Sequence, residues 1–246
     1  MSVFISIMPA DCVENSIELR GERYHHLARV CRVRVGEELR AALPDGRVLL
    51  TVVSEISTEA IIANVIGEGE RLPEQRCRIT LCPAVLKGEK MELVVQKATE
   101  LGAYAIAPLW AERCIPRWDA KQGKERAERW SRIAASAAEQ SERALPPIVT
   151  PPRVLADFLA TPGVRNIFLL HEREGQTLTQ VAAAHAGIIE LALLIGPEGG
   201  WTSGETEKIL AAGATPLHIS RQVFRAETAS IAALVVAQLT WGGWGE

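Results

Sequence analysis

Residues 194–205 read Leu-Ile-Gly-Pro-Glu-Gly-Gly-Trp-Thr-Ser-Gly-Glu, and residues 218–230 read His-Ile-Ser-Arg-Gln-Val-Phe-Arg-Ala-Glu-Thr-Ala-Ser. Each stretch interrupts an apolar pattern with a short loop, at 196–200 and at 220–228. A short apolar run precedes each loop and a helical pattern follows it. In an α/β sheet both loops would therefore emerge at the carboxyl ends of strands, where such folds bind ligands. These two loops are the first candidates for a functional site.

Strand-like runs alternate with helical patterns around these loops and back to residue 79. The expected strands are 79–86, 104–109, 166–170, 190–195 and 216–219, and the expected helices are 87–101, 121–143, 177–186, 205–212 and 226–240. Thr202 and Glu205 fit a capping box that starts one of these helices. Such alternation predicts a largely parallel sheet with helices on both faces.

The last expected helix is apolar almost all the way round, from Ala229 to Leu239. A helix without a polar face has to be buried on every side, so it either runs through the core or packs against a second subunit. We predict a homodimer.

The first part of the chain has a different pattern. Short apolar or alternating runs at 4–7, 17–19, 48–53 and 60–66 are separated by turn residues such as Pro44-Asp45-Gly46, which predicts a small β-rich domain, in the form of a compact barrel. A polar segment rich in Gly and Glu, 67–75, then resembles a linker. The predicted domains are therefore 1–72 and 73–246.

Basic residues cluster inside the first domain. Residues 20–34 hold five arginines and two histidines against one acid, and the candidates for RNA contact are Arg20, Arg23, His25, His26, Arg29, Arg32 and Arg34. Such a cluster beside an aromatic residue is suited to a phosphate backbone, although a solvated basic face has the same composition. Arg143, near the end of the expected helix 121–143, is a further candidate under the same alternative.

Composition limits the remaining function classes. The chain is 48% apolar and 23% charged, as in an ordinary globular protein, and it lacks the roughly 20 consecutive apolar residues of a membrane helix, so we expect a soluble cytoplasmic protein. Five cysteines without a paired motif or a nearby histidine cluster predict neither disulfides nor a metal site. A net charge of −3 argues against general coating of nucleic acid but leaves a local RNA surface open.

The two loops differ in how much they reveal. The first has glycines that allow a ligand close to the backbone, but no Gly-Lys-Ser/Thr follows, which excludes a P-loop, and a tight structural turn would also explain it. In the second, Arg225 precedes the amino end of a helix, where a cation is disfavoured, whereas Glu227 is favoured there. Arg225 thus breaks a local rule, as residues of functional sites often do.

Four motifs together resemble one known family. They are Gly196-Pro-Glu-Gly-Gly200, Arg225-Ala-Glu-Thr-Ala229, Gln96-Lys-Ala-Thr-Glu-Leu-Gly102 and Ala138-Glu-Gln-Ser-Glu-Arg143, and with the segment 24–32 they cover nearly the whole chain. In this order they are similar to the ribosomal RNA small subunit methyltransferase E family.

The resemblance implies a SPOUT-type methyltransferase with a PUA-like amino-terminal domain and a deep trefoil knot near the carboxyl end. It implies a homodimer that uses S-adenosylmethionine to methylate N3 of uridine 1498 in the 16S rRNA of the small ribosomal subunit. Three loops of the knot would hold the cofactor, and the matching positions of this chain are Leu170, His171, Gly196, Pro197, Glu198, Gly199, Gly200, Ile219, Ser220, Val223, Phe224 and Arg225.

The expected catalytic residues follow from the reaction. N3 of neutral uridine carries a proton, so the enzyme must help to remove it or stabilise the resulting anion. Arg225 is the candidate for stabilising the uracil oxygens, and Glu198 or Glu227 for accepting the proton; either acid has a structural alternative as a loop anchor.

The chain departs from the family pattern at two positions of the second loop. It has Ser220 where the family usually has glycine and Gln222 where it has an arginine. Two rival functions remain at this stage: a SPOUT methyltransferase for another rRNA or tRNA nucleotide, and a catalytically silent assembly factor that binds rRNA.

Overall fold

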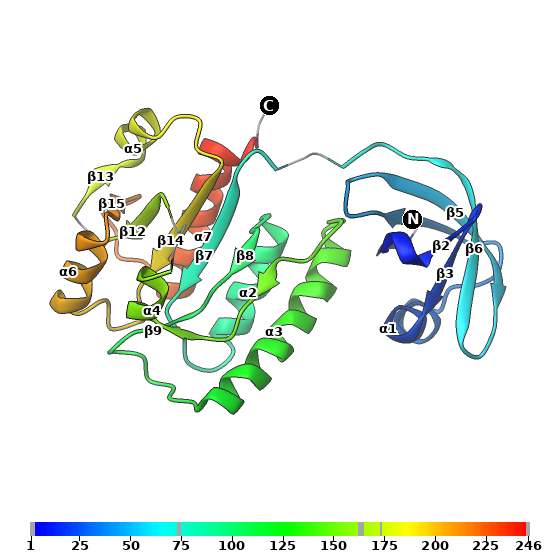
Figure 1. Ribbon diagram of the computed structural model, residues 1–246, viewed down its shortest axis with the longest axis horizontal. Coiled ribbons are helices and arrows are strands. Elements are labelled where there is room, and N and C mark those ends of the chain that lie inside the picture. Colours follow the sequence, from blue (N-terminus) through cyan, green and yellow to red (C-terminus); the bar gives the residue numbers. More distant parts are fainter. Residues whose placement is uncertain (1–2, 73–74, 162–164, 173, 245–246) are drawn as a thin grey trace. The chain divides into compact units, whose positions relative to one another are not determined.

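The computed structural model describes residues 3–72, 75–161, 165–172 and 174–244, and it divides into two units (Figure 1). Unit 1 comprises Met1–Glu74 and Ala138–Leu145, and unit 2 comprises Gln75–Ala137 and Pro146–Glu246. No local pattern links residues 138–145 to unit 1. Within the described residues, no helix is long and apolar enough to cross a membrane.

Unit 2 is built on a seven-stranded sheet in which all strand pairs are parallel. Its strand order is β10-β8-β7-β14-β12-β15-β13. The strands are β7 Arg78–Pro83, β8 Ala105–Ile106, β10 Ile148–Val149, β12 Ile167–Leu170, β13 Gln176–Thr177, β14 Glu190–Ile195 and β15 Thr215–His218. A separate parallel pair is formed by β9 Leu109–Trp110 and β11 Arg153–Val154. The predicted continuous strand at 104–109 was wrong, because β8 and β9 belong to different sheets.

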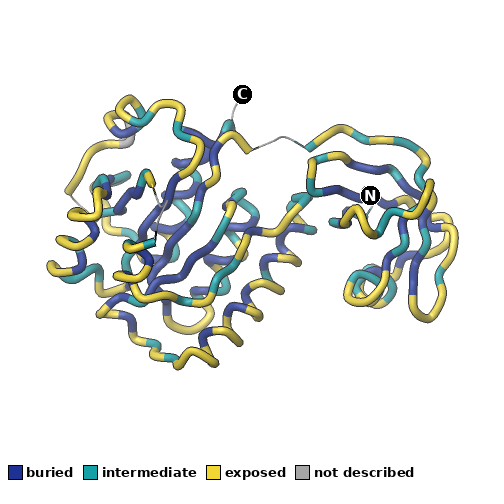
Figure 2. The backbone as a smooth tube through the Cα atoms, viewed as in Figure 1, coloured by how far each residue is buried: buried dark blue, intermediate teal, exposed yellow. Residues whose placement is uncertain are grey.

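Helices cover both faces of this sheet, as the sequence predicts. The helices are α2 Lys90–Glu100, α3 Ala120–Gln140, α4 Leu155–Leu159, α5 Leu178–Ala184, α6 Ser203–Ala211 and α7 Ala226–Ala237. Alternate residues of β14 face opposite sides: Leu191 and Leu193 pack in one cluster with α2 and α7, whereas Ala192 and Leu194 pack in another with α4 and α6. The inner strands are accordingly buried while the helices expose their outer sides (Figure 2).

Strand β15 lies between β12 and β13, which are consecutive in the chain. The connection from β12 to β13 therefore has to cross β15. The approach is close: the N–H of His171 donates to the carbonyl of Leu217, and a Cβ added at Gly175, where φ is +115°, would lie 2.6 Å from the carbonyl oxygen of Pro216. Only glycine fits at this crossing.

Helix α7 differs in part from its prediction. The α-helix ends at Ala237 and continues as a π-helical turn, Gln238–Gly242. Residues such as Ala229 and Leu234 are buried, but Ile231, Val235 and Val236 are only half-buried, and Leu239 is exposed. The helix therefore does not run through the core of this chain, and one of its apolar faces reaches the surface.

Unit 1 contains a six-stranded sheet with the order β1-β4-β5-β6-β3-β2. The strands are β1 Val3–Ser6, β2 Cys12–Val13, β3 Ser16–Arg20, β4 Glu38–Ala42, β5 Val48–Ile56 and β6 Ala60–Glu68. All neighbours pair antiparallel except β1 and β4. A short 3-10 helix, Pro9–Asp11, precedes β2. The β-rich domain expected from the sequence is thus present.

Several elements of unit 1 had no counterpart in the expected pattern, among them β4 and the helical turns of the basic segment. Strand β4 was missed because it is short and two of its three apolar residues are alanines, which have a low strand propensity. The basic segment forms helix α1, Gly21–His25, followed by a π-helical stretch, His26–Cys31, of which only Leu27 is fully buried. One buried residue gives too weak a periodicity to predict a helix.

The start of α6 yields a stability prediction. Glu205 is only 4% exposed, and its carboxylate accepts hydrogen bonds from the backbone N–H of Glu112 at 2.8 Å and of Thr202 at 2.9 Å. Glu205→Ala leaves both donors unpaired and should lower the free energy of unfolding by about 2 kcal/mol. Glu207→Ala on the same helix, an exposed position, is the control and should change it by less than about 0.5 kcal/mol in a denaturant titration. Equal effects would contradict the assignment.

Candidate functional site

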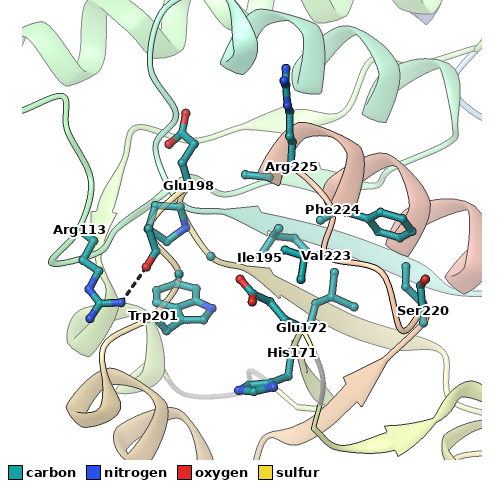
Figure 3. Close-up of a pocket in the computed structure, with 18 of the residues that line it drawn as sticks. Arg113, His171, Glu172, Ile195, Glu198, Trp201, Ser220, Val223, Phe224 and Arg225 are labelled. Carbon is teal, nitrogen blue, oxygen red and sulfur yellow. Dashed lines mark hydrogen bonds between the residues drawn. The ribbon is translucent and has the colours of Figure 1, made fainter.

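Three loops meet around one cavity of unit 2, with a volume of about 530 Å³ (Figure 3). They follow β12, β14 and β15, which are neighbours in the parallel sheet, so all three leave the sheet at the same edge. The structure brings twelve predicted residues to this cavity: Leu170, His171, Gly196, Pro197, Glu198, Gly199, Gly200, Ile219, Ser220, Val223, Phe224 and Arg225. Glu227, the remaining candidate, does not line it.

Further lining residues were not predicted: Arg113, Glu172, Ile195, Trp201, Thr206, Gln222, Ala226 and Ala229. Five of them adjoin predicted positions, so extending each loop by one residue would have found these five: Glu172, Ile195, Trp201, Gln222 and Ala226. Arg113 is different, because it comes from the segment between β9 and α3 and no motif marks it.

The first loop is a tight glycine turn held from outside. The N–H of Gly200, where φ is +69°, donates to the carbonyl of Pro197 at 2.8 Å. The guanidinium of Arg113 donates to the carbonyl of Gly199 at 2.7 Å (Figure 3). A Cβ at Gly199 would lie 3.3 Å from the Arg113 side chain, which is closer than ordinary contact. The glycines thus let Arg113 and the loop backbone approach each other.

The conformation of the second loop shows how serine can stand at position 220, where the family usually has glycine. The Ser220 hydroxyl accepts a hydrogen bond from the N–H of Gln222 at 3.0 Å, and Ser220 is not among the described residues with positive φ. The serine therefore closes a local turn without backbone strain.

The same loop ends at Arg225, which is the N-cap residue of α7. Its backbone is extended, with φ −65° and ψ 152°, and its carbonyl accepts from the N–H of Ala229 at 2.8 Å. Its side chain is exposed and makes no side-chain cap. A positive group is therefore placed beside the positive end of a helix dipole, where it gains nothing for helix stability.

The interior of the cavity is mixed in character. Ile195, Val223 and Phe224 supply apolar walls, and Figure 3 shows Glu172 and Trp201 near its centre. The indole N–H of Trp201 is buried and has no hydrogen-bond partner in the described part of the chain. A buried donor of this kind is costly unless a ligand or water pairs with it.

A charged cluster lies next to the cavity. The ammonium of Lys90, the first residue of α2, is 3.0 Å from Glu198 and 3.5 Å from Glu227. Burial alone would raise the pKa of Glu198, but the hydrogen bond from Lys90 and backbone hydrogen bonds outweigh it and lower that pKa.

The eight predicted RNA-contacting residues all belong to unit 1. Three are engaged with acids: Arg20 with Glu18, Arg23 with Asp11 at 2.7 Å, and His26 with Glu139 at 3.4 Å. Burial lowers the pKa of Arg143 to about 10, so it still carries its charge at neutral pH. The exposed members are Arg20, His25, Arg29, Arg32 and Arg34.

Within the residues that the structure describes, no group of three or more potential ligands is arranged to hold a metal ion.

Comparisons with known proteins agree with this arrangement. A family model described as an RNA methyltransferase domain matches residues 73–238, and one described as an RNA methyltransferase PUA domain matches residues 19–66. Ribosomal RNA small subunit methyltransferase E of Mycobacterium tuberculosis is 32% identical over 91% of this chain and 86% of its own length. That of Bacillus subtilis is 30% identical, over 89% of this chain and 88% of its own.

Two solved structures have the same fold over nearly their whole length. Ribosomal RNA small subunit methyltransferase E from Neisseria gonorrhoeae, bound to S-adenosylmethionine, matches with a TM-score of 0.86 and 26% identity over 99% of this chain and 100% of that one. A methyltransferase from Legionella pneumophila, also in complex with that cofactor, matches with a TM-score of 0.86 and 29% identity over 97% and 98%. With its PUA domain, parallel sheet and glycine loop, the chain belongs to the ribosomal RNA small subunit methyltransferase E family.

Proposed function

We propose that this protein transfers a methyl group from S-adenosylmethionine to N3 of one uridine, uridine 1498, in the 16S rRNA of the small ribosomal subunit. One observation carries the proposal: three loops from distant parts of the sequence line a single cavity with all twelve residues that the family resemblance selects. Membership of the family supports the rRNA substrate, and the cofactor in two related structures supports the methyl donor.

The cavity fits S-adenosylmethionine in size and in chemistry. A volume of about 530 Å³ is within the range of small-molecule pockets. At Gly200 a Cβ would have only Oε1 of Glu172 within 4 Å, at 3.9 Å, so a ligand can approach the backbone there. The unpaired N–H of Trp201 is a donor and the Glu172 carboxylate an acceptor for the polar groups of the cofactor, and Val223 and Phe224 supply apolar contact.

The protein's part in the reaction is to orient the base and manage its charge. When the cofactor is bound, its sulfonium supplies the methyl group; the carbon–sulfur bond breaks as the bond to N3 forms, and the N3 proton leaves. Arg225 lines the cavity and is free to extend toward the uracil oxygens as negative charge develops on them. Glu198 or Glu227 is the candidate acceptor for the proton.

The target uridine has to be unpaired or flipped out of a helix, because pairing hides N3. Figure 3 supports an entry on the side of Glu198 and Arg225, since both side chains extend the same way, away from Trp201 and Glu172. The exposed arginines of unit 1, Arg29, Arg32 and Arg34, would contact phosphates of the rRNA.

Two structural features of the family belong to this proposal. The crossing of β15 by the connection between β12 and β13 supports the trefoil knot. The half-buried apolar face of α7, with Ile231, Val235 and Val236, supports a homodimer, because a second subunit would cover it.

The proposal is tested by methylation of rRNA that lacks the modification. The purified protein is incubated with S-adenosylmethionine and either naked 16S rRNA or small subunits, and N3-methyluridine is mapped by mass spectrometry. We expect one methyl group, at uridine 1498. Methylation elsewhere would identify a different substrate, and no heat on titration with S-adenosylmethionine would identify a catalytically silent binding factor.

A substitution of Arg225 tests its catalytic role. Measured at saturating S-adenosylmethionine, Arg225→Ala should lower kcat by about a hundredfold, the usual effect of removing one donor that stabilises a developing anion. Arg221→Ala is the control, because Arg221 is an exposed arginine of the same loop that does not line the cavity. Methylation by Arg225→Ala at the native rate would refute the role.

The basic surface of unit 1 gives a separate prediction. Replacing Arg29 and Arg32 together by alanine should raise the KM for rRNA and leave the Kd for S-adenosylmethionine unchanged. In a plot of the logarithm of the rRNA binding constant against the logarithm of the salt concentration, the magnitude of the slope should fall by about one to two. Arg47→Ala is the control in the same unit, because Arg47 is exposed and already paired with Asp45 at 2.8 Å. An unchanged salt slope would show that phosphates bind elsewhere.

A further inference from the structure

Lys90, at the start of α2, forms ion pairs with two segments that lie far from it in the sequence. Its ammonium is 3.0 Å from Oε1 of Glu198 in the glycine loop and 3.5 Å from Oε2 of Glu227 in the first turn of α7. All three side chains are partly shielded from water, with side-chain exposures of 35% for Lys90, 29% for Glu198 and 13% for Glu227. Ion pairs are screened less in such places than on an open surface.

Lys90 is the cation that pairs with both Glu198 and Glu227. Oε2 of Glu227 is buried and has no hydrogen-bond partner among the described residues, and the Lys90 ammonium at 3.5 Å supplies its counter-charge. Glu198 is held more tightly, because the Lys90 hydrogen bond is joined by backbone hydrogen bonds at Lys87 and at Glu198 itself. Without Lys90, two negative charges would face each other at this point.

The position of the acids makes the ion pairs matter for the site. Glu198 lies between Pro197 and Gly199, which line the cavity, and Glu227 is two residues from Arg225, which lines it from the other side. Holding the two carboxylates on one ammonium therefore fixes the glycine loop against the start of α7. Since α2 packs against α7 in the core, Lys90 is itself on a rigid support.

We propose that Lys90 is a positioning residue, which clamps the glycine loop to the start of α7 and so fixes the position of Arg225 relative to the cofactor cavity. The proposal rests on the proposed function and deepens it, since it gives Glu198 and Glu227 the role of anchors for Lys90. In this role both carboxylates are paired with the Lys90 ammonium in the resting protein.

The experiment compares three variants of the full chain. Lys90→Met removes the charge and keeps the length of the side chain, Lys90→Arg keeps the charge, and Lys97→Met is the matched control. Lys97 is also on α2, has a similar side-chain exposure of 38% and pairs with Glu100, away from the cavity. Circular dichroism and thermal melting first establish that each variant is folded.

Hydrogen exchange is the readout that needs neither cofactor nor RNA. The amides of Gly200 and Ala229 are suitable reporters, because each donates to a carbonyl within one of the clamped segments. Both should exchange at least about tenfold faster in Lys90→Met than in the native chain, and at the native rate in Lys97→Met. Native exchange of both amides in Lys90→Met would overturn the proposal, whether or not the protein is a methyltransferase.

Binding and catalysis supply the second readout. Lys90→Met should raise the Kd for S-adenosylmethionine by about tenfold and lower kcat, Lys90→Arg should recover most of both, and Lys97→Met should change neither. A rise in the KM for rRNA alone would overturn the proposal by making Lys90 an RNA contact. If the native chain neither binds the cofactor nor methylates rRNA, the proposed function fails, and the exchange rates still decide whether Lys90 is a clamp.

Discussion

Backbone hydrogen bonding between β14, β12 and β15 holds the whole site together. Parallel pairing sets Leu169 opposite both Leu194 and Pro216, so the ends of the three strands stop at nearly the same level. Each loop then starts within reach of the others, although the strands lie far apart along the chain. Shifting one strand by a single residue would turn its side chains to the opposite face of the sheet and move its loop away from the cavity.

The sequence of the glycine loop does not by itself favour one conformation. A run with three glycines has a large conformational entropy when it is free, which disfavours any single shape. The fold counters this with cations from other segments: Arg113 binds the carbonyl of Gly199, and Lys90 binds the carboxylate of Glu198. Gly200 therefore leaves its part of the backbone open to a ligand, and contacts with Arg113 and Lys90 fix the shape of the loop.

Local pattern was sufficient for much of the fold and for the loops of the site. The apolar run Glu190–Ile195 is found as β14 with the expected ends, and the capping box of Thr202 and Glu205 starts α6. Short-range signals fail where the structure depends on distant contacts. Lys90 and Arg113 are ordinary surface residues by their neighbours in sequence, and only the folded chain brings them to the glycine loop. The helical turns at 21–31 were missed because only Leu27 in them is fully buried, which gives too short an apolar pattern to predict a helix.

The position of β15 between β12 and β13 also fixes when the site can exist. During synthesis the flanking strands leave the ribosome first, and the strand that separates them follows about 40 residues later, after β14 and α6. A nascent chain that stops before residue 215 has one cavity loop missing and two strands without their common neighbour. The complete pocket can therefore form only late in synthesis, and a fragment from an interrupted translation would carry the glycine loop without the loop that follows β15.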